Sequence, residues 1–242
     1  MLEESMSGPV TNPVFLAFEA SGDQASVAVL AADGRQAMFH HAARHGHAAA
    51  ITSLAEAALQ ACGIDAGAVT HVAAGCGPGS FTGIRVALAA AKGYQLACKA
   101  MPVGLSCLAA MAVHAQHDHP GNKAIWLATA DTRRGSFFCQ PFAEDGTALG
   151  EIMDIDPDLP DDSTQSINAM IKDGWEGARV IGPGAAILAA ASAGRLLADD
   201  GHSPLEAIQI AQLASTLVAS QKPLPPLAPL YVAPAFLGPS RS

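Results

Sequence analysis

Two stretches of the chain, 112 residues apart, carry the same pattern of residues. The apolar runs at 15–19 and 127–131 each end in a carboxylate, and each is followed by a polar turn and a second apolar run. An Asp-Gly pair then follows in both copies, at 33–34 and 145–146, and such a pair between apolar runs is a strong hairpin signal. A repeat this long indicates two copies of one domain rather than a solenoid of short units.

The first copy predicts three strands, a helix, a further strand and a second helix. Continuous apolar runs predict the strands, apolar residues at helical spacing predict the helices, and Gly63 is a C-cap signal. In the second copy, residues 182–184 repeat the Gly-Pro-Gly of 77–79. We therefore expect an α/β fold of two duplicated domains, each a mixed sheet flanked by helices. The expected strands are 14–18, 26–30, 36–40 and 69–74, and the expected helices are 48–62 and 82–98.

Changes in composition predict where the domains begin and end. A polar stretch with Pro120 and Gly121, at 114–122, is the expected boundary. The acidic residues within 151–163 are accompanied by two prolines, which is typical of a solvated loop. We expect a disordered tail at 1–13, an N-terminal domain at 14–113, a C-terminal domain at 123–221 and a proline-rich segment at 222–242.

The balance of charge argues against a broad nucleic-acid-binding face. The 242 residues include 13 Lys and Arg against 22 Asp and Glu, a net charge of −9 at pH 7, whereas such binding needs a basic surface. No apolar run reaches the roughly 18 residues of a membrane span, and the polar first residues do not resemble a signal peptide. The five cysteines form no Cys-x-x-Cys pair and indicate reduced thiols in a cytoplasmic protein.

A glycine-rich turn at 77–85 connects a predicted strand to a predicted helix. This arrangement can aim backbone N–H groups at an anion, and the candidate cofactor-binding residues here are Gly77, Gly79 and Ser80. The turn lacks the Gly-Lys-Ser/Thr ending of a Walker loop and the third glycine of a dinucleotide-binding loop. The sequence therefore favours the structural alternative, in which Ser80 caps the helix and the glycines permit a tight turn.

Glu19 and Asp131 are a second candidate cofactor site, because they end equivalent strands of the two copies. We expect them to face each other across a cleft, where paired carboxylates could hold Mg²⁺. Without a phosphate-binding loop beside them, structural hydrogen bonding is the favoured explanation.

Other catalytic and metal sites find little support in the sequence. Ser80 lacks both flanking glycines of a nucleophile elbow, and Ser106 has Gly104 before it but lacks the glycine after it. His41 and His45 would share a face if their segment were helical, but the glutamate of a metalloprotease helix is missing. We predict no catalytic and no metal-binding residue.

Small residues recur at every fourth position of the helix that follows the turn, at Gly83, Ala87 and Ala91. Such a stripe lets another helix approach closely, but it can equally face the protein's own core, and both explanations stay open. If it meets a partner, Ala87→Arg or Ala91→Arg should block docking and leave the fold intact. The candidate interface residues are Thr82, Gly83, Arg85, Val86, Ala87, Ala90 and Ala91 on this helix, and Ser53 and Ala57 on the helix before it.

The run Gly77-Pro78-Gly79-Ser80-Phe81-Thr82-Gly83-Ile84-Arg85 resembles the signature of the TsaB (YeaZ) family of bacteria. The resemblance includes Ser21 and the segments 44–47, 131–133 and 229–231, and it extends over most of residues 14–232. It departs from the family at 19–21, where Glu-Ala-Ser replaces the usual Asp-Thr-Ser, and at 48–49, where two alanines replace a polar pair.

The resemblance implies the actin-like ATPase fold with two ribonuclease-H-like domains. It also implies a role in making N6-threonylcarbamoyladenosine (t6A) at adenosine 37 of ANN-decoding tRNAs. Family members are non-catalytic partners of the catalytic paralogue TsaD and work with the ATPase TsaE; the complex uses ATP or ADP and Mg²⁺ and reaches the tRNA. The helices matching 48–62 and 82–98 form the interface with TsaD or, in the isolated protein, with a second copy.

Two other functions are compatible with the sequence. One is an ATP-binding enzyme of the same superfamily, with an active site between the domains. The other, less favoured, is a metallopeptidase.

Overall fold

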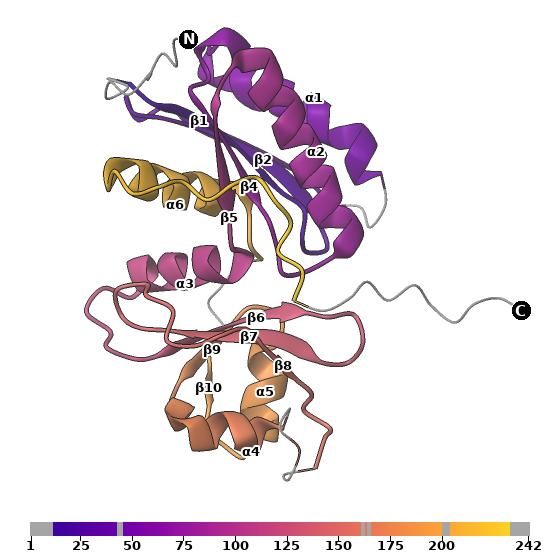
Figure 1. Ribbon diagram of the computed structural model, residues 1–242, viewed down its shortest axis with the longest axis vertical. Coiled ribbons are helices and arrows are strands. Elements are labelled where there is room, and N and C mark those ends of the chain that lie inside the picture. Colours follow the sequence, from indigo (N-terminus) through magenta and orange to yellow (C-terminus); the bar gives the residue numbers. More distant parts are fainter. Residues whose placement is uncertain (1–11, 43–45, 161–162, 164–165, 200–203, 233–242) are drawn as a thin grey trace, which may run out of the picture.

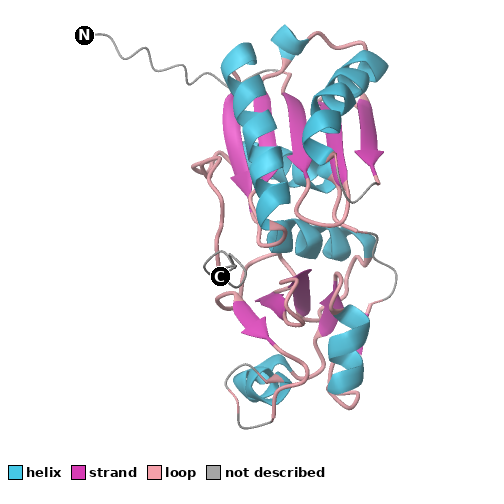
Figure 2. Cartoon of the chain, turned by 90° about the vertical axis from the view of Figure 1, so that its right-hand side faces the viewer, coloured by secondary structure: helices cyan, strands magenta, loops and turns pink. Residues whose placement is uncertain are grey.

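A computed structural model of the protein describes residues 12–42, 46–160, 163, 166–199 and 204–232. Two sheets lie one beyond the other along the length of the molecule, each with helices beside it (Figures 1 and 2). The disordered tail predicted at 1–13 falls almost entirely outside the described residues, as do the last ten residues of the segment at 222–242.

The first sheet has the strand order β3-β2-β1-β4-β5. Its central strand β1 pairs antiparallel with β2 on one side and parallel with β4 on the other. The predicted hairpin is confirmed, since β2 and β3 pair antiparallel across the turn at Asp33-Gly34. The bounds are β1 (Val14–Glu19), β2 (Ala25–Ala31), β3 (Gln36–His41), β4 (His71–Gly75) and β5 (Met101–Leu105).

Two long helices, α1 (His47–Cys62) and α2 (Phe81–Cys98), cover one face of this sheet. Both predicted helices are confirmed to within one residue. A left-handed Gly63 ends α1, after which η1 (Ala66–Ala68) leads into β4. No described helix combines the length and hydropathy that crossing a membrane requires.

The second sheet repeats the first, with the strand order β10-β9-β6-β7-β8. Its central strand β6 again pairs antiparallel with the next strand and parallel with β9, so the predicted duplication and the actin-like arrangement of two ribonuclease-H-like halves are confirmed. The bounds are β6 (Trp126–Asp131), β7 (Phe137–Phe142), β8 (Met153–Ile155), β9 (Arg179–Ile181), β10 (Leu197–Ala198), α4 (Ile167–Met170), the π-helical η2 (Ile171–Trp175) and α5 (Ala185–Ala191).

The prediction of a solvated loop at 151–163 is wrong in part. Residues 153–155 form β8, which pairs antiparallel with β7. Ile155 is buried in the core of the second half, and Asp154 forms an ion pair with Arg134. The prediction missed this three-residue edge strand because its two apolar side chains, Met153 and Ile155, stand in a segment dominated by acidic residues and prolines.

The two remaining helices, α3 (Cys107–Asp118) and α6 (Ala207–Ala219), are exchanged between the halves. Helix α6 comes late in the chain but packs on the first sheet, where Ile210 shares a buried cluster with Phe15. Helix α3 follows the first sheet but packs on the second, where Leu108 shares a cluster with Trp126. In Figure 1, α3 lies between the two sheets and α6 runs beside the first.

This exchange corrects the predicted domain boundaries. The polar stretch at 114–122 is helical as far as Asp118, so the connection between the halves is shorter than expected. The C-terminal domain predicted at 123–221 includes α6, which belongs to the core of the first half. Polarity along the sequence could not reveal this, because the face that a helix covers is a matter of tertiary packing.

The described part of the C-terminal segment, residues 222–232, forms a strap along the first half. The Gly104 N–H of β5 donates a hydrogen bond of 2.8 Å to the carbonyl oxygen of Pro225, and the Leu230 N–H donates one of 2.8 Å to that of Cys76. A Cβ at Gly104 would collide with the carbonyl oxygen of Pro226, so glycine permits this close approach.

All five cysteines are free thiols. Four of them are buried and Cys98 is half-buried. Burial raises the pKa of the Cys107 and Cys139 thiols, which keeps these two protonated and unreactive.

Truncating Ile210 tests the exchange of helices. We expect Ile210→Ala to cost about 2–4 kcal/mol and to reduce amide hydrogen-exchange protection in β1 and β2, although Ile210 lies near the end of the chain. The matched variant Leu188→Ala, in the core beneath the second sheet, should instead reduce protection in β6 and β9. Loss of protection confined to the second sheet in Ile210→Ala would contradict the exchange.

Candidate functional site

The glycine turn packs against the loop that follows β1. Gly77 and Gly79 have φ values of +105° and +148°, which residues with side chains rarely adopt. The Ser80 N–H donates a hydrogen bond of 2.7 Å to the carbonyl oxygen of Ser21, and a Cβ at Gly79 would lie 2.6 Å from that same oxygen. These contacts account for the glycines through chain packing alone.

The start of α2 is held in the same way. A Cβ at Gly83 would overlap the carbonyl oxygen of Ala20, and the Ser80 hydroxyl accepts a hydrogen bond of 3.2 Å from the Gly83 N–H. Ser80 is therefore the helix cap that the sequence favoured. Ser106 caps α3 in the same manner, with its hydroxyl accepting from the Ala109 N–H at 3.3 Å.

Glu19 does not face a cleft, which corrects the predicted pair of carboxylates. Its side chain is only 1% exposed, and one oxygen accepts hydrogen bonds from the N–H and the hydroxyl of Ser21. The other oxygen lies 3.5 Å from the Cys107 sulfur, and a Cβ at Gly75 would overlap it. Burial raises the pKa of Glu19 above its ordinary value of 4.5, against the smaller opposing effect of the Ser21 hydrogen bonds.

Asp131, the second member of that pair, lines a pocket of about 360 Å³ between the two halves. It accepts a hydrogen bond of 2.6 Å from the Arg133 N–H, and the Arg133 guanidinium pairs across the halves with Asp23 at 2.8 Å. Glu19 does not line this pocket. Among the described residues, no group of three or more His, Cys, Asp or Glu side chains could hold a metal ion.

The histidine hypothesis also changes. His41 ends the strand β3 instead of lying on a helix, so the i, i+4 arrangement with residue 45 does not arise there. Residue 45 itself lies outside the described residues.

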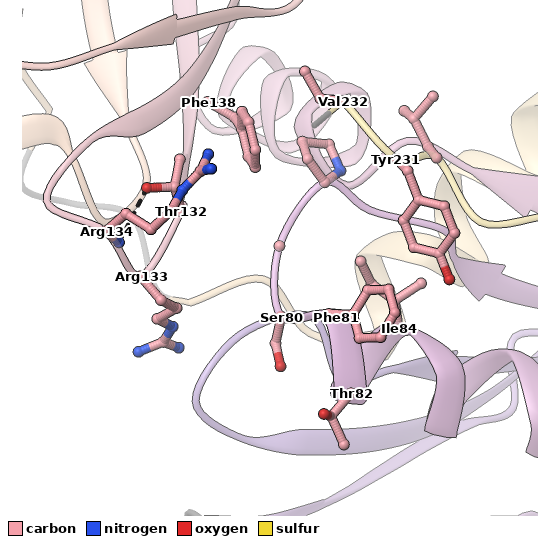
Figure 3. Close-up of a pocket in the computed structure, with 13 residues that line it drawn as sticks. Ser80, Phe81, Thr82, Ile84, Thr132, Arg133, Arg134, Phe138, Tyr231 and Val232 are labelled. Carbon is pink, nitrogen blue, oxygen red and sulfur yellow. Dashed lines mark hydrogen bonds between the residues drawn. The ribbon is translucent and has the colours of Figure 1, made fainter. Parts of the chain in front are cut away.

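A second pocket, of about 270 Å³, lies between the glycine turn, the β6–β7 loop and the strap (Figure 3). Arg133 and Arg134 reach toward it from the loop, and Phe81 and Tyr231 lie on the opposite side. Both arginines already have carboxylate partners, since Arg134 pairs with Asp154 at 3.0 Å.

A shallow groove of about 410 Å³ runs between α1 and α2 on the outer surface, and we call it the α1–α2 groove. Small or apolar side chains form most of its wall, and Leu96 adds a 76% exposed side chain further along α2. The described residues that line it are Ala48, Ile51, Thr52, Phe81, Thr82, Arg85, Val86, Ala89 and Ala90.

The structure divides the predicted interface residues into two sets. Of the candidates, Thr82, Arg85, Val86 and Ala90 line the groove, while Ser53 is exposed and Ala57 half-buried on α1. The stripe of Gly83, Ala87 and Ala91 is instead buried against the first sheet, so its assignment to a partner is wrong. The core explanation is correct for that stripe, because the sheet occupies the face to which it points.

The groove also contains residues that were not among the predicted interface residues, namely Ala48, Ile51, Thr52, Phe81 and Ala89. A signal for this face was present, since Ala89, Gly93 and Ala97 form a second row of small residues at every fourth position of α2. All three are exposed. Periodicity alone could not rank this row above the buried one.

Glu19→Gln tests the buried carboxyl beneath the turn. The folded protein binds the Glu19 proton more tightly than the unfolded chain does, because the pKa of Glu19 is raised. The contribution of the neutral carboxyl to the free energy of unfolding is therefore fully present below pH 4.5, and it is lost as the pH rises through the raised pKa. Gln retains an oxygen for Ser21 and cannot ionise. We expect urea unfolding to show the variant gaining stability relative to the parent as the pH rises above 4.5 and through the raised pKa of Glu19. Parallel pH curves would contradict this, and the exposed Glu56→Gln serves as the control.

Arginine substitutions distinguish the two faces of α2. Ala87→Arg should lower the free energy of unfolding by about 3 kcal/mol or more, because Ala87 is 0% exposed in the core. The exposed Ala89→Arg, two residues away, should stay within about 0.5 kcal/mol of the parent. Urea midpoints measure both values, and a stable Ala87→Arg protein would mean that this face is open to partners.

Solved structures with the same fold come from Pseudomonas aeruginosa. An uncharacterized protein with similarity to the peptidase YeaZ aligns with a TM-score of 0.71 and 22% identity, covering 91% of this chain and 100% of that one. YeaZ itself aligns with a TM-score of 0.71 and 21% identity over the same shares. The predicted resemblance to YeaZ is thus confirmed at the level of the fold.

Sequence comparison points in the same direction. An uncharacterized protein of Mycobacterium leprae is 33% identical over 111 residues, 44% of this chain and 28% of that protein, so the match spans less than a third of this relative's length. Residues 39–212 match the family described as TsaD, tRNA N6-adenosine threonylcarbamoyltransferase. Because this match covers more than half of the chain, the protein belongs to the TsaD family of tRNA N6-adenosine threonylcarbamoyltransferases.

Proposed function

We propose that this chain is a non-catalytic, YeaZ-like partner of a TsaD-like catalytic subunit that makes t6A at adenosine 37 of ANN-decoding tRNAs. The observation that carries the proposal is the exposed α1–α2 groove, with its wall of small and apolar side chains. A TsaE-like ATPase completes the complex, which uses ATP or ADP with Mg²⁺ and engages the tRNA in the cytoplasm. In isolation, the same surface pairs two copies of the chain.

The groove suits a helical partner for two reasons. Exposed small residues such as Ala48 and Ala89 let another pair of helices approach closely, and exposed apolar patches of this kind mark interaction surfaces. Helix α2 is packed on the first sheet through a fully buried face, which leaves the groove-lining face exposed to a partner. Binding acts by stabilising one conformation of the catalytic partner, through a difference in affinity between its conformations.

The pocket between the halves gives less support to an ATP-binding enzyme. Asp23 and Asp131 place two carboxylates on its wall, and Arg133, the cation among its described lining residues, already pairs with both. A polyphosphate entering the pocket would meet these carboxylates, and the glycine turn nearby is occupied by chain packing.

Calorimetry tests this distinction directly. Titration of the isolated chain with ATP and Mg²⁺ should release no heat of binding, whereas titration with the TsaD-like protein of the same organism should. Micromolar ATP binding by the chain alone would support the enzyme hypothesis instead. Stoichiometric zinc in the purified protein would support the metallopeptidase.

Ala89→Arg tests the groove as the docking surface. A long charged side chain on the α2 wall of the groove should abolish co-purification with the TsaD-like protein and leave the unfolding midpoint unchanged. Ala32→Arg, in the exposed hairpin turn of the first sheet, is the matched control and should co-purify normally. Retention of the complex by a folded Ala89→Arg protein would exclude this surface.

A further inference from the structure

Arg85 is held at the edge of the α1–α2 groove by two aromatic rings. Its guanidinium carbon lies 3.8 Å from the centre of the ring of Phe81, one turn earlier in α2. Its Nε donates a hydrogen bond of 3.1 Å to the hydroxyl of Tyr231, and the two rings are themselves 5.4 Å apart. Stacking and hydrogen bonding together restrict a side chain that would otherwise sample many rotamers.

Tyr231 reaches this position because the strap is anchored on the glycine turn. The Leu230 N–H bonds the Cys76 carbonyl, and a Cβ at Gly77 would lie 3.0 Å from the Leu230 carbonyl oxygen. The glycine turn therefore contacts both the start of α2 and the end of the strap and fixes their relative position. Residues 146 positions apart in the sequence, Arg85 and Tyr231, meet as a consequence.

The terminal nitrogens of Arg85 are still available for a partner. Within the described residues they form no hydrogen bond or ion pair, since Nε alone is used for Tyr231. Arg85 is exposed, and it is the charged side chain among the described residues that line the groove. A guanidinium held in this way presents two parallel N–H donors, a geometry that matches a carboxylate.

We propose that Arg85 is the docking cation of the α1–α2 groove, receiving an Asp or Glu carboxylate from a helix of the partner, with Tyr231 of the strap holding it ready. This inference rests on the proposed function and adds the chemistry of recognition. A protein carboxylate fits better than a nucleic-acid phosphate, because the surrounding wall is small and apolar and the chain carries a net charge of −9. Fixing Arg85 before binding reduces the conformational entropy lost in the complex.

The test measures affinity between the full chain and the purified TsaD-like protein of the same organism. We expect Arg85→Gln to weaken binding about tenfold and Tyr231→Phe, which keeps the ring and removes the hydroxyl, to weaken it about threefold. In the Arg85→Gln background, Tyr231→Phe should have no further effect, because the hydroxyl acts through Arg85. Lys92→Gln removes one exposed charge from α2 outside the groove lining and should bind like the parent.

The possible outcomes separate this inference from the proposed function. If the unaltered chain fails to bind, the proposed function is overturned and this inference with it. Two results with a binding parent chain would overturn this inference alone. One is an Arg85→Gln variant that binds as well as the parent. The other is a Tyr231→Phe substitution that weakens binding equally in the parent and in the Arg85→Gln variant. If the isolated chain binds tRNA directly and Arg85→Gln abolishes that binding, Arg85 contacts a tRNA phosphate instead of a protein carboxylate, and this inference is again overturned. Unfolding midpoints confirm that the variants are folded.

Discussion

Each sheet of this protein depends on a helix from the other half of the chain. A sheet whose faces are both apolar needs cover on both, and here α6 covers the inner face of the first sheet while α3 covers that of the second. Removing either helix would expose residues such as Phe15 or Trp126 to water, at a cost of about 1.5–3 kcal/mol for each large side chain. The two halves therefore form one cooperative structure, and the pockets between them have a defined geometry.

The glycine turn is the second element that positions the functional surface. It has the outline of a phosphate-binding loop, but its contacts go to the chain itself: to Ser21, to Ala20 and to the strap at Leu230. The buried Glu19 lies beneath it, joined to Ser21 and Cys107. A strand–turn–helix arrangement that could aim N–H groups at an anion is here packed against the chain itself and holds the start of α2 in place.

The packing of α2 on the first sheet in turn explains why the groove suits a partner. The buried row of Gly83, Ala87 and Ala91 lets the helix lie close to the sheet, and the opposite row remains exposed. A helix with small side chains on two opposite faces can pack closely on its own sheet with one face and be approached closely by a partner at the other. Because most side chains around the groove are small, a single long side chain such as that of Arg85 projects beyond them at its edge.

Local signals in the sequence were sufficient for much of the fold. The hairpin at Asp33-Gly34, the cap at Ser80 and the end of α1 at Gly63 follow from patterns that act within a few residues, and the repetition of such patterns 112 residues later indicates the duplication. Packing between distant residues decided the rest: the exchange of α3 and α6, the burial of Glu19, and the contact of Arg85 with Tyr231. Periodicity shows that α2 has rows of small residues, but only the sheet beneath the helix decides which row is core and which is surface, because burial depends on neighbours that the local sequence does not specify.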